Sequence, residues 1–290
     1  MHVKFSNHII KSTRQITSHI VRSPFALQEL RKDAVQLKSS FPTFMLDRMR
    51  TFGNDVAILD GSNNSETTFE RMVSETYKLA HAFRDFEVTD KMVVGILSPN
   101  DKNFFTCVMA VGLSGGITTT VNPLYTDEEI EYQLALTKAQ LLISHSSCLE
   151  KAIRVANNLN IGVLLLDGTL TSEGNLPVFD SIDGFINSVD ISDVDYDSFI
   201  DGSDHFDSNS PLIIPFSSGT TGKPKGVMLS HRNITANILQ SLHFEGKGLT
   251  RKHYGPQVAN ICPLPYFHIY GKFIVCLWLY CLNGRIISNR

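Results

Sequence analysis

Residues 211–231 read PLIIPFSSGTTGKPKGVMLSH, and they carry more chemical information than any other part of the chain. An apolar run with the character of a buried strand leads directly into residues 217–226, which contain four hydroxyl groups, three glycines and two lysines. Glycines allow backbone N–H groups to approach and converge on oxygen atoms. Hydroxyl groups add neutral donors, and lysine adds a compact positive charge. The segment therefore predicts a flexible loop that wraps around a polyphosphate.

The residues that follow this loop predict ordered structure. Residues 227–229 are apolar, and Ser230 is placed to cap a helix. Apolar side chains recur at helical spacing in that helix, at Ile234, Ile238 and Leu242. A Gly/Ser/Thr linker would share the composition of the loop, but a linker is seldom framed by an apolar strand and a capped helix. We therefore interpret the loop as part of a folded site.

The loop does not have the Walker A pattern. That motif places four residues between a glycine and Gly-Lys-Ser/Thr. Here only two residues separate Gly219 from Gly222, and a proline follows Lys223. The sequence therefore predicts a phosphate loop of another class.

Strands and helices alternate on the amino-terminal side of the loop. Apolar residues at helical spacing predict a helix over 67–86, begun by a capping box of Thr67 and Glu70. Four short apolar strands are expected at residues 92–97, 117–121, 141–143 and 163–166. The helices between them are expected from Phe104 to the Gly115-Gly116 pair, from Thr126 with a Glu129 capping box, and at 149–159. This alternation predicts an α/β fold with parallel sheets flanked by helices.

The segment before the strand at 211 is acidic. No Lys or Arg occurs between Val155 and Gly222, and nine Asp residues are spread among Ser, Gly and Asn from Asp180 to Asp207. Such a composition is typical of loops that stay in water. We expect a solvated connection here.

Composition and charge narrow the class of protein. With 290 residues, 42% hydrophobic and 19% charged, the chain has the balance of a globular protein of about two domain-sized units. The net charge is -3, so no basic field favours nucleic acid as a partner. The longest apolar run, 273–282, is about half of what a membrane-spanning helix needs and is expected to be a buried helix or strand.

The cysteines and the amino-terminal residues bear on the cellular compartment of the protein. The five cysteines have no spacing suited to zinc, so we expect no protein metal site and reduced thiols in an intracellular protein. Residues 1–20 form a basic arm, and no Asp or Glu occurs from Met1 to Gln28. A mitochondrial transit peptide and an untargeted arm both fit that bias, so cytoplasmic and organellar locations stay open.

Three segments carry a family resemblance. Residues 215–231 resemble the phosphate-binding signature of the adenylate-forming superfamily of acyl-CoA synthetases, luciferases and peptide-synthetase adenylation domains. Residues 115–144 (GGITTTVNPLYTDEEIEYQLALTKAQLLIS) and 264–271 (LPYFHIYG) resemble 4-coumarate-CoA ligases and their relatives. The resemblance implies a partial AMP-binding domain of αβαβα type over 21–290, with a first sheet unit at about 65–215 and a second from about 225.

The resemblance also implies a reaction. Members of this superfamily let a carboxylate attack the α-phosphate of ATP, which gives an acyl-adenylate and pyrophosphate, and then pass the acyl group to a thiol, usually that of coenzyme A. Magnesium is expected to bridge the phosphate oxygens. The implied ligands are therefore ATP, Mg²⁺, coenzyme A and a small carboxylic acid, either a fatty acid or an aryl-propenoic acid.

Individual residues take implied roles from the matching motifs. The ATP-contacting residues are Ser217, Ser218, Gly219, Thr220, Thr221, Gly222 and Lys225, of which the lysine meets the β- and γ-phosphates. Lys223 is either a phosphate contact or a solvated lysine. His268 lies between nucleotide and acyl pocket as a donor or gate, because a carboxylate has no proton to lose at pH 7. Tyr270 lines the acyl pocket, and His231 is a helix-start residue.

Other parts of the superfamily pattern have no counterpart in these residues. We find no later Tyr-Gly-x-Thr-Glu signature and no carboxy-terminal domain with its catalytic lysine. The chain alone is therefore expected to be an inactive fragment. A carboxy-terminal peroxisomal address is not testable from these residues. Two alternatives stay open: a relative with another second step, luciferase-like or carrier-protein loading, and a non-catalytic short product.

Overall fold

The computed structural model describes residues 39–61, 63–88, 91–168, 178–199, 207–217, 223–245, 257, 259–269, 271 and 284–288. All of them fall in one compact unit, Leu37–Arg290. The basic arm expected over 1–20 and the apolar run 273–282 lie outside the described residues.

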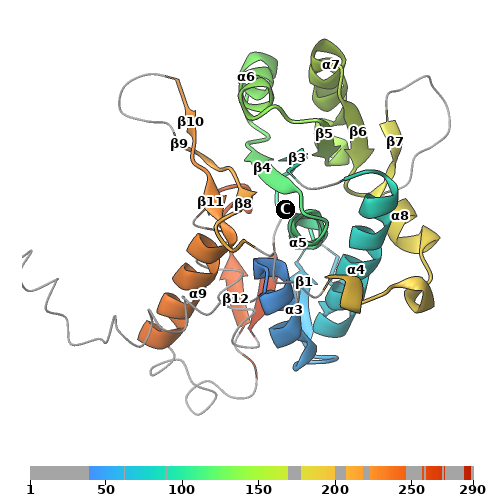
Figure 1. Cartoon of the computed structure of the whole chain (residues 1–290), viewed down its shortest axis with the longest axis vertical. Coiled ribbons are helices and arrows are strands. Elements are labelled where there is room, and N and C mark those ends of the chain that lie inside the picture. Colours follow the sequence, from blue (N-terminus) through green and yellow to red (C-terminus); the bar gives the residue numbers. More distant parts are fainter. Residues whose placement is uncertain are drawn as a thin grey trace, which may run out of the picture. The chain divides into compact units, whose positions relative to one another are not determined.

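A seven-stranded sheet forms the centre of this unit (Figure 1). Its order is β11-β8-β4-β3-β5-β6-β7. The bounds are β3 (Val93–Leu97), β4 (Ile117–Val121), β5 (Leu141–Ser144), β6 (Gly162–Leu165), β7 (Val178–Ser181), β8 (Pro211–Ile213) and β11 (Leu229–Ser230). All neighbours are parallel except β11, which runs antiparallel to β8. The four strands expected between 92 and 166 are confirmed to within a residue at each end.

Helices cover both faces of this sheet. They are α3 (Phe41–Arg50), α4 (Phe69–Asp85), α5 (Phe104–Leu113), α6 (Asp127–Thr137), α7 (Leu149–Leu159), α8 (Ile182–Ser188) and α9 (His231–Glu245). Side chains of a strand alternate between faces. In β3, Val94 and Ile96 join the core beneath α3, α4, α5 and α8, whereas Val93 and Leu97 join the core beneath α6 and α7. The expected α/β fold with helix-flanked parallel sheets is confirmed.

A second, four-stranded sheet takes strands from both ends of the described chain. Its order is β12-β13-β1-β2, with β1 (Val56–Asp60), β2 (Glu66–Thr68), β12 (Ala259–Cys262) and β13 (Arg285–Ser288). β13 is parallel to both β12 and β1. Strand β2 thus belongs to this sheet although it falls inside the first unit expected over 65–215. The division into domains therefore stays a prediction, and the two sheets are more interleaved than one cut in the sequence implies.

The expectation of a solvated acidic connection was wrong. The segment contains β7, α8 and two short 3-10 helices, η2 (Ile191–Asp193) and η3 (Asp197–Phe199). Five of its apolar side chains, Ile182, Ile186, Val189, Val194 and Phe199, are buried, and the guanidinium of Arg84 on α4 lies 3.7 Å from the ring centroid of Phe199. A few well-spaced apolar residues are enough to fasten an otherwise polar segment.

One of the two predicted capping boxes is confirmed. The Thr126 hydroxyl accepts from Glu129 N, and the Glu129 carboxylate accepts from Thr126 N. The other was wrong: α4 begins at Phe69 and is capped by the Thr68 hydroxyl, which accepts from Arg71 N, so Arg71 rather than Glu70 is the third helical residue.

Candidate active site

The predicted phosphate loop connects the two strands of a hairpin. Strand β9 (Phe216–Ser217) pairs antiparallel with β10 (Lys225–Gly226), and Ser217 lies directly opposite Lys225. Both of these residues are exposed. The structure thus brings the two ends of the predicted ATP-contacting set side by side. Ser218, Gly219, Thr220, Thr221 and Gly222 lie outside the described residues.

The hairpin continues the paired strands β8 and β11 of the large sheet (Figure 1). Val227 N donates to Pro215 O at 2.9 Å, which joins the two ribbons, and Ile214 N donates to Thr118 O at 2.8 Å on β4. After the hairpin, the Ser230 hydroxyl accepts from Asn233 N at 3.2 Å, so the expected cap of α9 is confirmed. The loop is therefore carried by ordered strands on both sides.

Buried threonines at the end of β4 connect the hairpin to the rest of the site. Thr119 Oγ1 donates to Ile214 O at 2.9 Å, and Thr120 Oγ1 donates to Phe267 O at 2.7 Å. Gln133 Nε2 on α6 donates to Thr119 Oγ1 and Thr120 O, both at 3.0 Å. Sequence reasoning missed these roles because Thr119 and Thr120 fit a β-branched strand. The signal was a run of hydroxyls in a buried strand, since buried polar groups need partners.

Asn100, just after β3, holds the segment that carries His268. Its Nδ2 donates to Leu264 O at 3.1 Å, and its Oδ1 accepts from Tyr266 N at 2.7 Å. The Tyr266 ring is fully buried, with centroids 5.9 Å from Phe104 and 4.7 Å from Phe105. The segment is thus fastened at the carboxyl ends of β3 and β4, where α/β sheets commonly bind ligands.

A small cavity brings the hairpin and His268 together. It measures ≈ 100 Å³ and is lined by Thr120, Asn122, Tyr125, Gln133, Pro215, Phe216, Phe267, His268 and Ile269. His268 is exposed, and its backbone N–H closes a turn on Pro265 O at 3.1 Å. Of the residues assigned to the acyl side, His268 therefore reaches the same cavity as the hairpin strand β9, and Tyr270 lies outside the described residues.

His231 has a structural setting. It is the first residue of α9, and its Nδ1 accepts from Phe41 N at 3.1 Å, at the start of α3. Burial lowers the pKa of His231 from 6.5 to about 4, because the charged imidazolium is disfavoured away from water. The neutral ring therefore ties α9 to α3, which agrees with its expected role as a helix-start residue.

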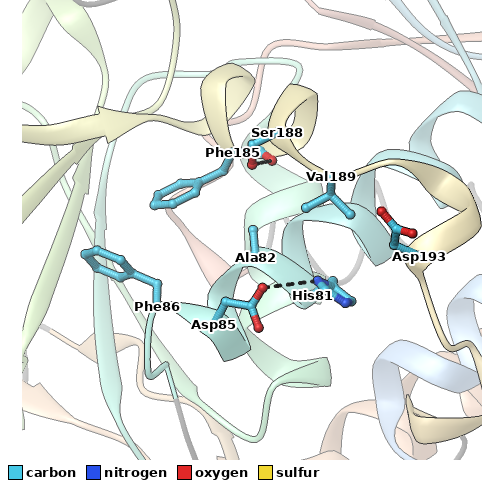
Figure 2. A pocket seen from close by; sticks show the side chains of 8 residues that line it. All are labelled: His81, Ala82, Asp85, Phe86, Phe185, Ser188, Val189 and Asp193. Atoms are coloured by element: carbon cyan, nitrogen blue, oxygen red, sulfur yellow. Dashed lines mark hydrogen bonds and ion pairs between the residues drawn. The ribbon is translucent and has the colours of Figure 1, made fainter.

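A larger cavity lies away from these residues, between α4 and α8 (Figure 2). It measures ≈ 350 Å³; the rings of Phe86 and Phe185 have centroids 5.4 Å apart, and His81 Nδ1 lies 3.5 Å from Asp85 Oδ2. None of the predicted site residues lines it. Within the described part of the chain, no group of three or more His, Cys, Asp or Glu side chains could hold a metal ion. Across the same residues, no helix is long and apolar enough to cross a membrane.

Together, these features define an α/β protein with a hydroxyl- and glycine-rich hairpin at the carboxyl edge of its large sheet. The chain belongs to the AMP-binding enzyme family, whose model matches residues 46–288. It is 26% identical over 235 residues to 4-coumarate:CoA ligase 1 from Petunia hybrida, and the aligned region covers 81% of this chain and 40% of that protein. It is 29% identical over 215 residues to 4-coumarate--CoA ligase 4 from Arabidopsis thaliana, covering 74% of this chain and 36% of the relative.

Solved structures show the same fold. A red-emitting luciferase from Phrixothrix hirtus superposes with a TM-score of 0.72 at 21% identity, over 86% of this chain and 46% of the luciferase. A long-chain-fatty-acid-CoA ligase from Archaeoglobus fulgidus gives 0.69 at 23% identity, over 87% of this chain and 47% of the ligase. The chain thus spans less than half the length of each of these relatives.

Proposed function

We propose that this chain supplies the phosphate-binding part of an enzyme that activates a carboxylic acid with ATP and transfers the acyl group to coenzyme A. The observation that carries the proposal is the cross-strand pair of Ser217 and Lys225, which closes a loop of hydroxyls and glycines at its base. It is supported by membership of the AMP-binding enzyme family and by similarity to 4-coumarate-CoA ligases.

The hairpin residues divide the task of holding a triphosphate. Lys225 is exposed on β10 and supplies positive charge for the β- and γ-phosphates, while Ser217, Ser218, Thr220 and Thr221 supply hydroxyl donors. Gly219 and Gly222 allow backbone N–H groups to approach the oxygens. The loop thus stabilises the charge that develops on the leaving pyrophosphate as the carboxylate attacks the α-phosphorus.

The proposed site is compatible with Mg²⁺, because the phosphates of the nucleotide supply ligands to the ion. Mg²⁺ keeps several waters and is held by phosphate oxygens with one or two carboxylates, so it needs no dedicated cage of protein side chains. The hairpin hydroxyls and Lys225 fit an ATP that carries Mg²⁺. When bound, the ion supplies charge neutralisation on the phosphates.

The acyl side of the site is assigned to the segment after β12. His268 donates to the carboxylate or gates it, and Tyr270 lines the acyl pocket. Thr120 and Asn100 fix this segment against the sheet, so that His268 is brought to the cavity that Phe216 also lines. Such positioning holds the carboxylate and ATP, two anions, in a geometry in which they can react. We further propose that residues 21–290 form a partial adenylation domain. The protein that contains it is proposed to be intracellular.

The test is carboxylate-dependent exchange of labelled pyrophosphate into ATP, measured on the longest protein product that contains this sequence. A panel of fatty and aryl-propenoic acids is assayed with the unaltered protein, with Lys225→Ala and with Lys78→Ala, which removes a lysine from α4 instead. We expect exchange in the unaltered protein and the Lys78 variant, and a loss of at least about tenfold in Lys225→Ala, because bonds to charged groups contribute about 1.5–3 kcal/mol. An absence of exchange with every acid would refute the proposal.

A further inference from the structure

The carboxyl end of the phosphate loop contacts a single tyrosine on α6. Tyr132 Oη donates to Pro224 O at 3.3 Å, and Lys223 Nζ lies 5.0 Å from the centroid of the Tyr132 ring. A cation within about 6 Å of an aromatic face is attracted to it. Tyr132 therefore holds two consecutive residues, the last two before Lys225 begins β10.

Tyr132 stands on a helix that is itself fixed. The capping box of Thr126 and Glu129 closes its start. Arg154 on α7 donates to the Asp127 carboxylate through Nε at 2.7 Å and through Nη2 at 3.3 Å. The neighbour of Tyr132, Gln133, is buried and donates to the end of β4. The helix thus provides a rigid support for the Lys223–Pro224 step.

The anchored carbonyl controls the direction of the chain into β10. Proline fixes its own φ and disfavours the helical region for the residue before it, so Lys223 and Pro224 have little freedom. Once Pro224 O is held, the path of the next residue is largely set. The next residue is Lys225, the cation assigned to the phosphates.

A cavity also adjoins the contact between the described hairpin residues and α6. It measures ≈ 290 Å³ and is lined by Tyr125, Glu128, Glu129, Tyr132, Gln133, Phe216, Lys223 and Pro224. At this cavity, the hydrogen bond and the cation–π contact of Tyr132 join the hairpin to α6.

We propose that Tyr132 is the positioning residue of the phosphate hairpin. It holds the Lys223–Pro224 step on α6, so that Lys225 is positioned for a polyphosphate before the nucleotide arrives. Such preorganisation lowers the ordering cost of binding. The inference rests on the proposed function for its consequence in binding, and on the hairpin contacts alone for the positioning itself.

The positioning is tested without any ligand by the rate of tryptic cleavage after Lys225. Trypsin does not cut before proline, so the Lys223–Pro224 bond is silent and the Lys225–Gly226 bond reports the hairpin. Mass spectrometry follows the peptides that end at Lys225 or begin at Gly226 in the unaltered chain, in Tyr132→Phe, in Tyr132→Leu and in Tyr196→Phe. The last variant removes only the hydroxyl of Tyr196, which lies between η2 and η3 and whose ring packs on Tyr77. We expect cleavage about fivefold faster in Tyr132→Leu, an intermediate rate in Tyr132→Phe and no change in Tyr196→Phe.

The consequence for binding is tested by titrating MgATP into the same four proteins. Tyr132→Phe is expected to raise the Kd about threefold and Tyr132→Leu about tenfold, with unchanged midpoints of urea unfolding. Unaltered cleavage after Lys225 in Tyr132→Leu would overturn the inference, and so would faster cleavage at all sites together with a lowered unfolding midpoint. A failure of the proposed function shows differently, as an absence of MgATP binding by the unaltered chain while cleavage after Lys225 still depends on Tyr132.

Discussion

The buried imidazole of His231 predicts a specific loss of stability in mild acid. Its pKa is about 4 in the folded chain and 6.5 ordinarily. Above pH 6.5 both states carry a neutral ring, and the shift has no effect. As the pH falls from 6.5 towards 4, the unfolded chain takes up a proton that the folded chain refuses, so folding becomes less favourable. At pH 5 this difference costs about 2 kcal/mol, and below pH 4 it levels at about 3 kcal/mol.

The matched variant is His231→Asn. An Asn Oδ1 can take the place of Nδ1 and accept from Phe41 N, but it does not titrate. Urea unfolding followed by circular dichroism at pH 7.5 and pH 5 gives the free energy of unfolding of both proteins. The unaltered chain should lose about 2 kcal/mol more than the variant between the two pH values. An equal loss in both would refute the reasoning, because every other titrating group is shared.

Two further substitutions test the polar contacts that assemble the site. Asn100→Leu removes the bonds to Leu264 O and Tyr266 N and should lower the free energy of unfolding by about 2 kcal/mol, measured in urea, because two backbone groups lose their partners. Thr119→Val keeps the shape but leaves Ile214 O without its donor and should cost about 1–3 kcal/mol in the same assay. A stability equal to that of the unaltered chain would contradict the role given to the residue concerned.

Helix bounds and caps could be predicted from local sequence patterns. The α7 helix begins and ends where its apolar spacing predicted, and the Thr126 capping box starts α6. The phosphate loop was expected between ordered elements, and it is carried by β9 and β10. These features depend on residues within about one or two turns or strands of one another, where propensity and spacing act directly.

Strand pairings and side-chain contacts between residues far apart in the sequence could not be predicted in this way. Strand β1 pairs with β13 more than two hundred residues later, and no periodicity in either strand names its partner. The bonds of Asn100 to 264–266 and the contact of Arg84 with Phe199 are likewise set by where the elements come to rest. An Asn after Ser-Pro is typical of a turn, and an Arg at the end of a helix is typical of a solvated face. Neither pattern therefore indicated a contact with a distant segment.

The most direct test of the account is calorimetric titration of MgATP into this chain and into Lys225→Ala, with Lys78→Ala as the control. The account predicts saturable binding by the chain and the control, weakened at least about tenfold in Lys225→Ala, because the lysine opposite Ser217 meets the phosphates. Equal affinity in all three proteins would contradict the assignment of the hairpin as the polyphosphate site.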